Sequence, residues 1–190
     1  MHYFTSTTHS SEVYITLCHI THCTTATSDR FLLTLQGHHL SGLKYGIEIY
    51  GNTCDTYLSK LEKLNNKILR ILQNKSLSSH VIDLYKYYDT LPVSLLHLYQ
   101  ILVFVHKFIH HKQNLPDIFA SYFIENSLIY YHNTRGKSNL HVTLVQSEFG
   151  KRSLTHKGSV LWNNLPDDLK STHNTTEFKE SLRHLLYTSP

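Results

Sequence analysis

The run from Val93 to His111 restricts the fold most, because its apolar residues leave almost no polar side. They are Leu95, Leu96, Leu98, Ile101, Leu102, Val103, Phe104, Val105, Phe108 and Ile109. A helix that is apolar all round is normally buried between other elements. Polar residues make the run a poor membrane span: Ser94, His97, Gln100, His106 and Lys107. We therefore predict a buried central helix over residues 93–111 in a mainly α-helical domain.

Residues 55–73 predict a second helix, with an apolar face and a basic face. Its apolar residues recur at three- and four-residue steps: Leu58, Leu61, Leu64, Ile68, Ile71 and Leu72. Four cations recur at the same steps, about 140° around the helix from that stripe: Lys60, Lys63, Lys67 and Arg70. Two interpretations of the basic face stay open, a solvated surface and a ridge that follows the phosphates of a nucleic acid.

Shorter elements are expected after the central helix. Pro116 suits a first helical position, so a short amphipathic stretch is expected over residues 117–124. Residues 141–145 alternate in polarity and are expected to pair with residues 151–156 in one small β-hairpin.

The end of the chain predicts helical structure. Asp167 and Asp168 follow a proline and are expected to begin a helical turn rather than to serve in catalysis. A closing helix is expected over residues 175–187, with Thr175 or Thr176 as its N-cap.

Residues 1–41 differ from the rest in composition and charge. They are rich in Thr, Ser and His, and they predict an irregular, poorly ordered segment. They carry one Lys or Arg against two Asp or Glu, a net charge of −1, whereas residues 42–190 carry 17 against 12, a net charge of +5. That excess is compatible with contact to nucleic acid. Three Cys are too few for a disulfide framework, so an intracellular setting, nuclear or cytoplasmic, is expected.

Motifs that would mark an enzyme are missing from the sequence. It has no Gly-rich phosphate loop, no Gly-x-Ser-x-Gly and no His-Glu-x-x-His. Residues 87–90 approach a polymerase Tyr-x-Asp-Asp but lack the second carboxylate of a two-metal site. A zinc site drawn from Cys18, His19, His22 and Cys23, followed by His38 and His39, is a remote alternative, because the spacing fits no structural zinc template. We predict no catalytic residue, metal ligand or cofactor in this chain.

Several sequence blocks follow one another in a fixed order. The first runs from Tyr45 to Asn52 and leads into the helix that ends near Ile71. The later blocks are Leu91-Pro92-Val93 with Leu98-Tyr99-Gln100, Leu115-Pro116 with Ile118-Phe119, His132-Asn133-Thr134-Arg135, Gly158 through Trp162-Asn163 to Leu165-Pro166, and Phe178-Lys179 with Leu182 and Leu185. Together they resemble the C-terminal region of reverse transcriptases from non-LTR (LINE-type, jockey-like) retrotransposons.

The resemblance implies an RNA-directed DNA polymerase whose catalytic carboxylates lie in an upstream palm, which this sequence does not match. The matching part, residues 42–190, would be the thumb and post-polymerase region that grips template and product. Tyr50 stands where the family usually has Trp, and residues 1–41 match nothing in the family. A truncated copy of a mobile element is the simplest account, and Mg²⁺ would be a cofactor of the full-length family enzyme only.

The expected partner is the backbone of RNA or DNA, bound weakly and in a salt-sensitive way, without DNA synthesis, a membrane or a small-molecule substrate. Eight residues are the predicted contacts: Lys60, Lys63, Lys67, Arg70, Arg135, Lys137, Lys151 and Arg152. Trp162 is expected to be a core anchor, with base stacking as the alternative. Two other interpretations remain, a helical protein-interaction module and a relic without function.

Overall fold

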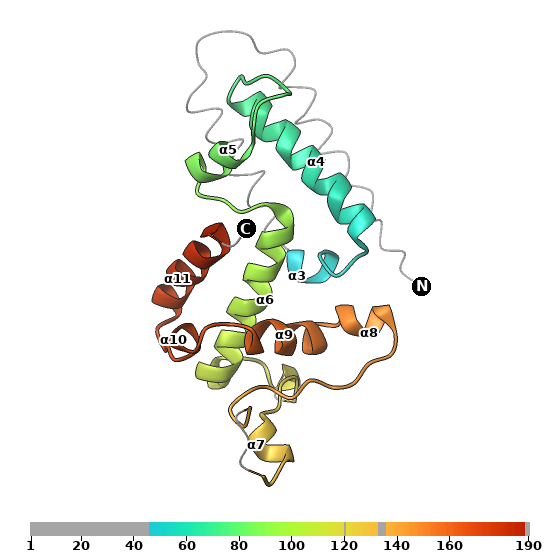
Figure 1. The fold of residues 1–190 in the computed structure, drawn as a ribbon, viewed down its shortest axis with the longest axis vertical. Helices are drawn as coiled ribbons and strands as arrows, with labels where there is room; N and C mark the ends of the chain where they lie inside the picture. The colour runs from blue at the N-terminus through green and yellow to red at the C-terminus, as the bar shows by residue number, and fades with distance from the viewer. Residues whose placement is uncertain (1–45, 120, 133–135, 189–190) are drawn as a thin grey trace, which may run out of the picture. The chain divides into compact units, whose positions relative to one another are not determined.

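The structure is a computed structural model that describes residues 46–119, 121–132 and 136–188 (Figure 1). The chain divides into two units, residues 1–40 and residues 41–190, and every described residue belongs to the second. The predictions for residues 1–41, including the remote zinc site, lie outside the described residues.

The predicted core helix is confirmed as α6, which spans Val93–His110. More than half of its 18 residues are buried. Helices from both sides of the sequence pack on it: α3 (Ile47–Tyr50), α4 (Asp55–Leu72), α9 (Leu154–Asn163) and α11 (Thr175–Thr188) (Figure 1). By length and mean hydropathy, 1.3, α6 also resembles a membrane span, but burial of most of it inside the fold is typical of a core helix.

The predicted amphipathic helix is confirmed as α4. Its apolar face packs on α6, and near its C-terminal end Leu69 joins a small second core with residues of α5 (Ile82–Tyr87). The stripe differs from the prediction at one turn, where Leu64 is 39% exposed and Asn65 is buried. Asn65 donates a hydrogen bond of 2.9 Å to the hydroxyl of Tyr85, which explains how a polar side chain occupies the buried face.

The mainly α-helical fold class is confirmed, but the predicted β-hairpin is wrong. The second expected strand lies in α8 (Glu148–Arg152) and the start of α9. Ser147 and Ser153 cap these helices, because their hydroxyls accept hydrogen bonds from the N–H groups of Gly150 and His156. Residues 141–145 form no strand, and the one β-bridge among the described residues joins Glu125 and Leu140. The capped helices α8 and α9 therefore form where the short alternation in polarity of residues 141–145 had predicted a hairpin partner.

The remaining elements are short: η1 (Lys112–Asn114), η2 (Asp117–Phe119), α7 (Asn126–Ile129) and α10 (Asp167–Lys170). The helical stretch expected over residues 117–124 is reduced to the single turn of η2. The start of α10 at Asp167 confirms the expected helical turn. The predicted cap of α11 is wrong by one residue, since Asn174 Oδ1 accepts the N–H of Thr176 at 2.9 Å.

Two glycines allow helices to approach the core closely. A Cβ atom on Gly51, at the end of α3, would lie 2.6 Å from the ring of His97 on α6. A Cβ atom on Gly158, within α9, would lie 2.9 Å from the ring of Phe123. Real Cβ atoms do not make such contacts, so the two glycines set the distance of α3 and α9 from their neighbours.

Histidines at the C-terminal end of α6 hold the segment between α10 and α11. The Nε2 atoms of His106, His110 and His111 lie 2.8, 3.0 and 3.1 Å from the backbone carbonyls of residues 172, 170 and 173. A carbonyl only accepts, so each Nε2 carries the proton. The His106 ring also stacks on Phe178, with centroids 4.1 Å apart. We call His106, His110 and His111 the histidine clasp.

Burial makes protonation of two α6 histidines unfavourable. It lowers the pKa of His106 to about 4, and the neighbouring imidazoles of His110, His111 and His173 lower it further. Burial also lowers the pKa of His97 to about 4, with a smaller contribution from the Lys157 ammonium, whose Nζ lies 3.3 Å from Nδ1. Both rings are therefore neutral near pH 7.

We predict that the free energy of unfolding falls as the pH is lowered from 6.5 to 4. In this window the unfolded chain binds more protons than the folded chain, so stability present above pH 6.5 is lost as the pH falls. Urea unfolding should give about 2 kcal/mol less stability near pH 5 than near pH 7.5 for each of His97 and His106. His106→Gln should remove about half of this dependence, whereas the exposed control His184→Gln should keep it. The same pH dependence in His106→Gln and the unchanged chain would contradict the assignment.

Candidate nucleic-acid interface

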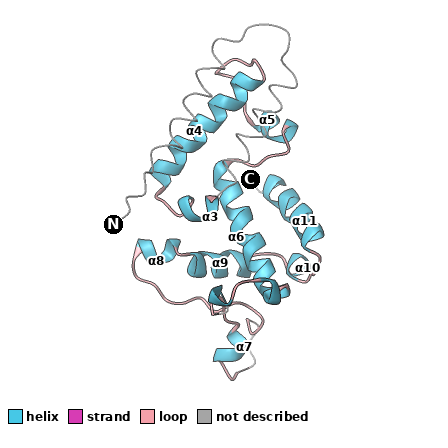
Figure 2. Cartoon of the chain, turned by 180° about the vertical axis from the view of Figure 1, so that it is seen from behind, coloured by secondary structure: helices cyan, strands magenta, loops and turns pink. Residues whose placement is uncertain are grey.

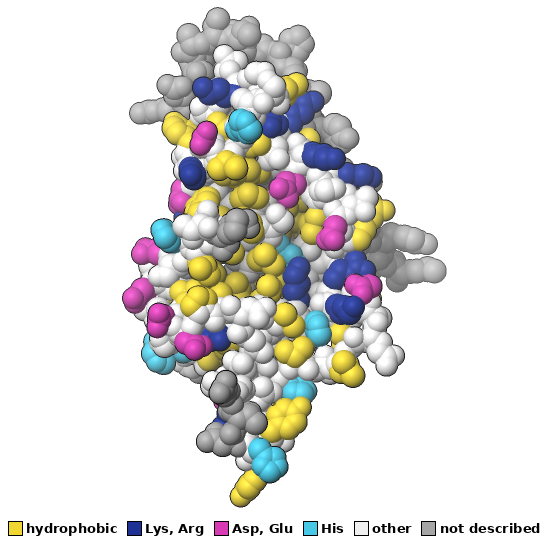
Figure 3. Space-filling view, viewed as in Figure 1, with side chains coloured by type: hydrophobic (Ala, Val, Ile, Leu, Met, Phe, Trp, Pro, Cys, Tyr) yellow, Lys and Arg dark blue, Asp and Glu magenta, His cyan; other side chains and the backbone are white. Residues whose placement is uncertain are grey.

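Three of the predicted contact residues form an exposed row on α4. Lys60, Lys63 and Lys67 are all exposed, and their three- and four-residue spacing places them on one face, away from the face that packs on α6. The Nζ atom of Lys60 lies 5.4 Å from the centroid of the Tyr57 ring. Figure 3 shows cationic side chains gathered along the edge over α4 and again, lower, near α8. We call Lys60, Lys63 and Lys67 the lysine row.

Arg70, the fourth predicted cation of this helix, has a different environment. Its side chain is half-buried, and its Nε donates a hydrogen bond of 2.9 Å to the carbonyl of Ser79. Arg70 therefore fastens the loop between α4 and α5, a role that its helical spacing did not indicate.

Two further predicted residues lie on α8. Lys151 is exposed and its Nζ lies 2.6 Å from a carboxylate oxygen of Glu148, which is also exposed. This hydrogen bond and the charge of the ammonium lower the pKa of the Glu148 carboxyl. Arg152 is half-buried and its Nε donates to the Glu148 carbonyl at 3.2 Å. An exposed pair such as Lys151–Glu148 adds little stability, so Lys151 can exchange its partner at small cost.

A groove connects α4 with α8. It has a volume of about 650 Å³ and is lined by Tyr50, Asn52, Tyr57, Leu58, Leu61 and Phe149. Tyr57 of α4 is 62% exposed and Phe149 of α8 is 84% exposed, so two aromatic rings stand at the surface beside cations from both helices. The sequence pattern did not predict a role for either ring, because residues 57 and 149 come to line one groove only in the folded chain.

Lys137, a predicted loop contact, does not join this surface. Lys137 is exposed, but its backbone carbonyl accepts the N–H of Ser127, which places it beside α7. In both Figure 1 and Figure 2, α7 lies beyond α9 as seen from α4. Arg135 lies outside the described residues. The structure therefore gathers the α4 and α8 cations on one side and leaves Lys137 apart.

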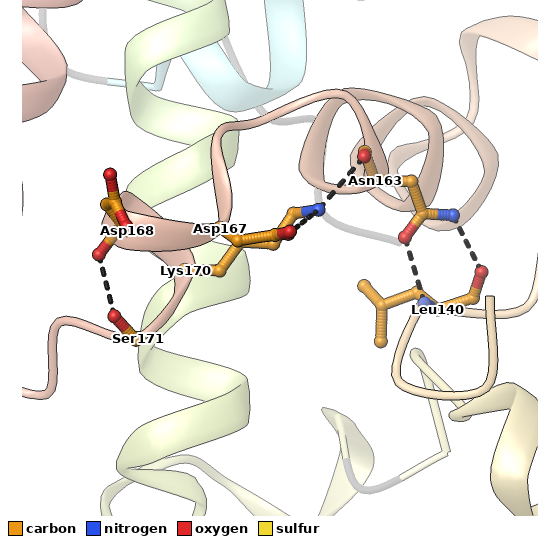
Figure 4. Close-up of polar contacts among 6 residues, drawn as sticks. All are labelled: Leu140, Asn163, Asp167, Asp168, Lys170 and Ser171. Atoms are coloured by element: carbon orange, nitrogen blue, oxygen red, sulfur yellow. Dashed lines mark hydrogen bonds and ion pairs between the residues drawn. The ribbon is translucent and has the colours of Figure 1, made fainter. Parts of the chain in front are cut away.

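The block around Trp162 is part of the core. Trp162 is buried, which confirms the core anchor and leaves no face for a nucleic-acid base. Asn163 next to it bonds the backbone of Leu140 twice, accepting its N–H at 2.9 Å and donating to its carbonyl at 2.8 Å (Figure 4). Lys170 Nζ donates to the Asn163 carbonyl at 3.0 Å and pairs with Asp167 at 3.2 Å. These contacts join the 136–140 segment, α9 and α10.

No group of three His, Cys, Asp or Glu side chains in the described parts of the chain is placed to hold a metal ion. No protein-family model, no curated protein and no solved structure matches this chain.

We predict that Asn163→Ala destabilises the fold. The substitution leaves the backbone N–H and carbonyl of the buried Leu140 without these partners, which should lower the free energy of unfolding by about 2 kcal/mol. Denaturant unfolding measures the change. Asn164→Ala, at the exposed neighbour, is the control and should change stability by less than about 0.5 kcal/mol. Equal stability of the two variants would argue against the double hydrogen bond.

Proposed function

We propose that this chain binds the backbone of RNA or DNA, and that residues 42–190 derive from the thumb and post-polymerase region of a non-LTR retrotransposon reverse transcriptase. The lysine row and the α8 cations are the proposed contacts. The sequence carries no match to the carboxylate motifs of a polymerase palm, so the proposal is binding without DNA synthesis.

The observation that carries the proposal is the availability of the lysine row. Among the described residues, no carboxylate lies within ion-pair distance of Lys60, Lys63 or Lys67. From Lys60 to Lys67 the helix rises by seven steps of about 1.5 Å, about 10 Å in all, which compares with about three nucleotides of a strand at roughly 3.4 Å each. An ammonium that meets a phosphate releases condensed counterions, so such a row favours a polyanion.

The groove beside the lysine row favours a single-stranded nucleic acid, whose bases are unpaired, as the ligand. Tyr57 and Phe149 expose their rings at its two sides, and base stacking on an aromatic ring is favourable for every base. Cations that follow the backbone and aromatic rings that take the bases are the usual combination in single-strand binding. Contacts of this kind position a nucleic acid without reading its sequence.

The test is the salt dependence of binding to a fluorescent single-stranded RNA or DNA. The affinity should fall steeply between low and physiological salt. Lys60→Gln with Lys63→Gln should weaken binding at low salt by about tenfold and reduce the slope of log affinity against log salt by about 1.4. Polarisation titrations at several salt concentrations measure both quantities.

The matched control removes two exposed lysines elsewhere, Lys86→Gln with Lys112→Gln, at the same change in net charge. It should leave the slope close to that of the unchanged chain. If the two double variants behave alike, the lysine row is not the interface. Affinity that does not change with salt would reject backbone binding altogether.

A second candidate function, protein interaction, is favoured by one observation. Apolar side chains are exposed around α7, where Leu128 is 79% exposed and Ile129, Tyr130 and Tyr131 are exposed as well. An apolar surface of this kind binds a partner with little dependence on salt. The salt titration therefore separates the two candidates.

A further inference from the structure

A second cationic site lies between α6 and α11, apart from the lysine row. It is a cleft of about 240 Å³, bounded by the turn at Asp89 and Thr90. Its lining includes the charged side chains of Asp89, Lys107, Lys179 and Arg183 and the amide of Gln100. In both ribbon views α11 runs beside α6, and the two helices are in contact (Figure 2). None of these residues belongs to the predicted nucleic-acid contacts.

The charges in the cleft do not balance. Lys107, Lys179 and Arg183 contribute three positive charges, and Asp89 contributes one negative charge. Asp89 forms an ion pair with Arg183. No ion pair among the described residues includes Lys107 or Lys179. Two positive charges therefore remain without an ion-pair partner at the lining of this cleft, which favours an anion with a charge near −2.

Arg183 is held in position before any ligand arrives. Its guanidinium is paired with Asp89 and lies 5.8 Å from the centroid of the Tyr99 ring. Asp89 itself has a left-handed backbone, φ 44°, stabilised by hydrogen bonds from its N–H to Lys86 and from the Thr90 N–H to the Tyr85 carbonyl. The hydroxyl of Tyr187 donates to the Thr90 carbonyl at 2.5 Å. An arginine fixed in this way loses little entropy on binding.

We infer that this cleft binds a phosphate group, as inorganic phosphate or a phosphomonoester. A phosphomonoester carries about −1.5 to −2 charges near neutral pH, which matches the excess of the cleft. Arginine and lysine are the side chains that phosphate oxygens prefer, and the amide of Gln100 adds a neutral donor. The volume lies below the roughly 300–1,000 Å³ of pockets for larger ligands, which suits a single small anion.

The experiment is an NMR titration of the full 190-residue chain with inorganic phosphate. We expect saturable shifts at Lys107, Lys179 and Arg183, and a dissociation constant raised about tenfold by Lys179→Ala and by Lys107→Ala. Lys112→Ala, at an exposed lysine outside the cleft, is the matched control and should bind phosphate like the unchanged chain. Circular dichroism checks that each variant keeps its helices.

Two arms distinguish the source of the phosphate. Tighter binding of a 5′-phosphorylated oligonucleotide than of its 5′-hydroxyl form, abolished by Lys179→Ala, supports the end of a nucleic acid. Binding of inorganic phosphate and nucleoside monophosphates, with no such difference between the oligonucleotides, supports a small phosphorylated molecule. The inference is overturned if phosphate causes no saturable shifts in the cleft. It is also overturned if the folded Lys107→Ala and Lys179→Ala variants bind phosphate as tightly as the unchanged chain. Lys60→Gln with Lys63→Gln should not change phosphate binding, so this site and the lysine row can fail separately.

Discussion

Burial of most of α6 is the constraint on which the other described elements depend. Exposure of the many leucine, valine, isoleucine and phenylalanine side chains of α6 to water is unfavourable, and helices that precede and follow α6 in the sequence cover them. Gly51 and Gly158 let two of them come close. The partner helices α4 and α11 are amphipathic, and their exposed residues are mainly polar. The lysine row is exposed because the opposite face of α4 is needed to cover α6.

Polar residues of α6 form hydrogen bonds with neighbouring segments of the fold. The histidine clasp fixes the segment that leads into α11, and α11 in turn brings Arg183 and Lys179 to the side of α6 that carries Lys107. The cleft proposed to bind phosphate thus depends on the same packing that buries His106. Both proposed binding surfaces are consequences of one core: α4 presents cations on its outer face, and α11 presents them at its edge.

Helical periodicity was enough to predict α4, α6 and α11, because each pattern extends over three or more turns. The hairpin prediction was wrong because a five-residue alternation carries less information than the caps at Ser147 and Ser153. For the site, spacing indicated the lysine row correctly as one exposed face, but not the bond from Arg70 to Ser79. The groove and the phosphate cleft combine residues far apart in the chain, such as Tyr57 with Phe149, and depend on tertiary packing.

The most direct test of the proposed interface is lysine acetylation followed by mass spectrometry, with and without a saturating single-stranded RNA. If the backbone lies along α4, Lys60, Lys63 and Lys67 should be modified several-fold more slowly in the complex, while Lys86 and Lys112 should react at unchanged rates. Equal protection of all five lysines, or protection at Lys86 and Lys112 alone, would contradict the account.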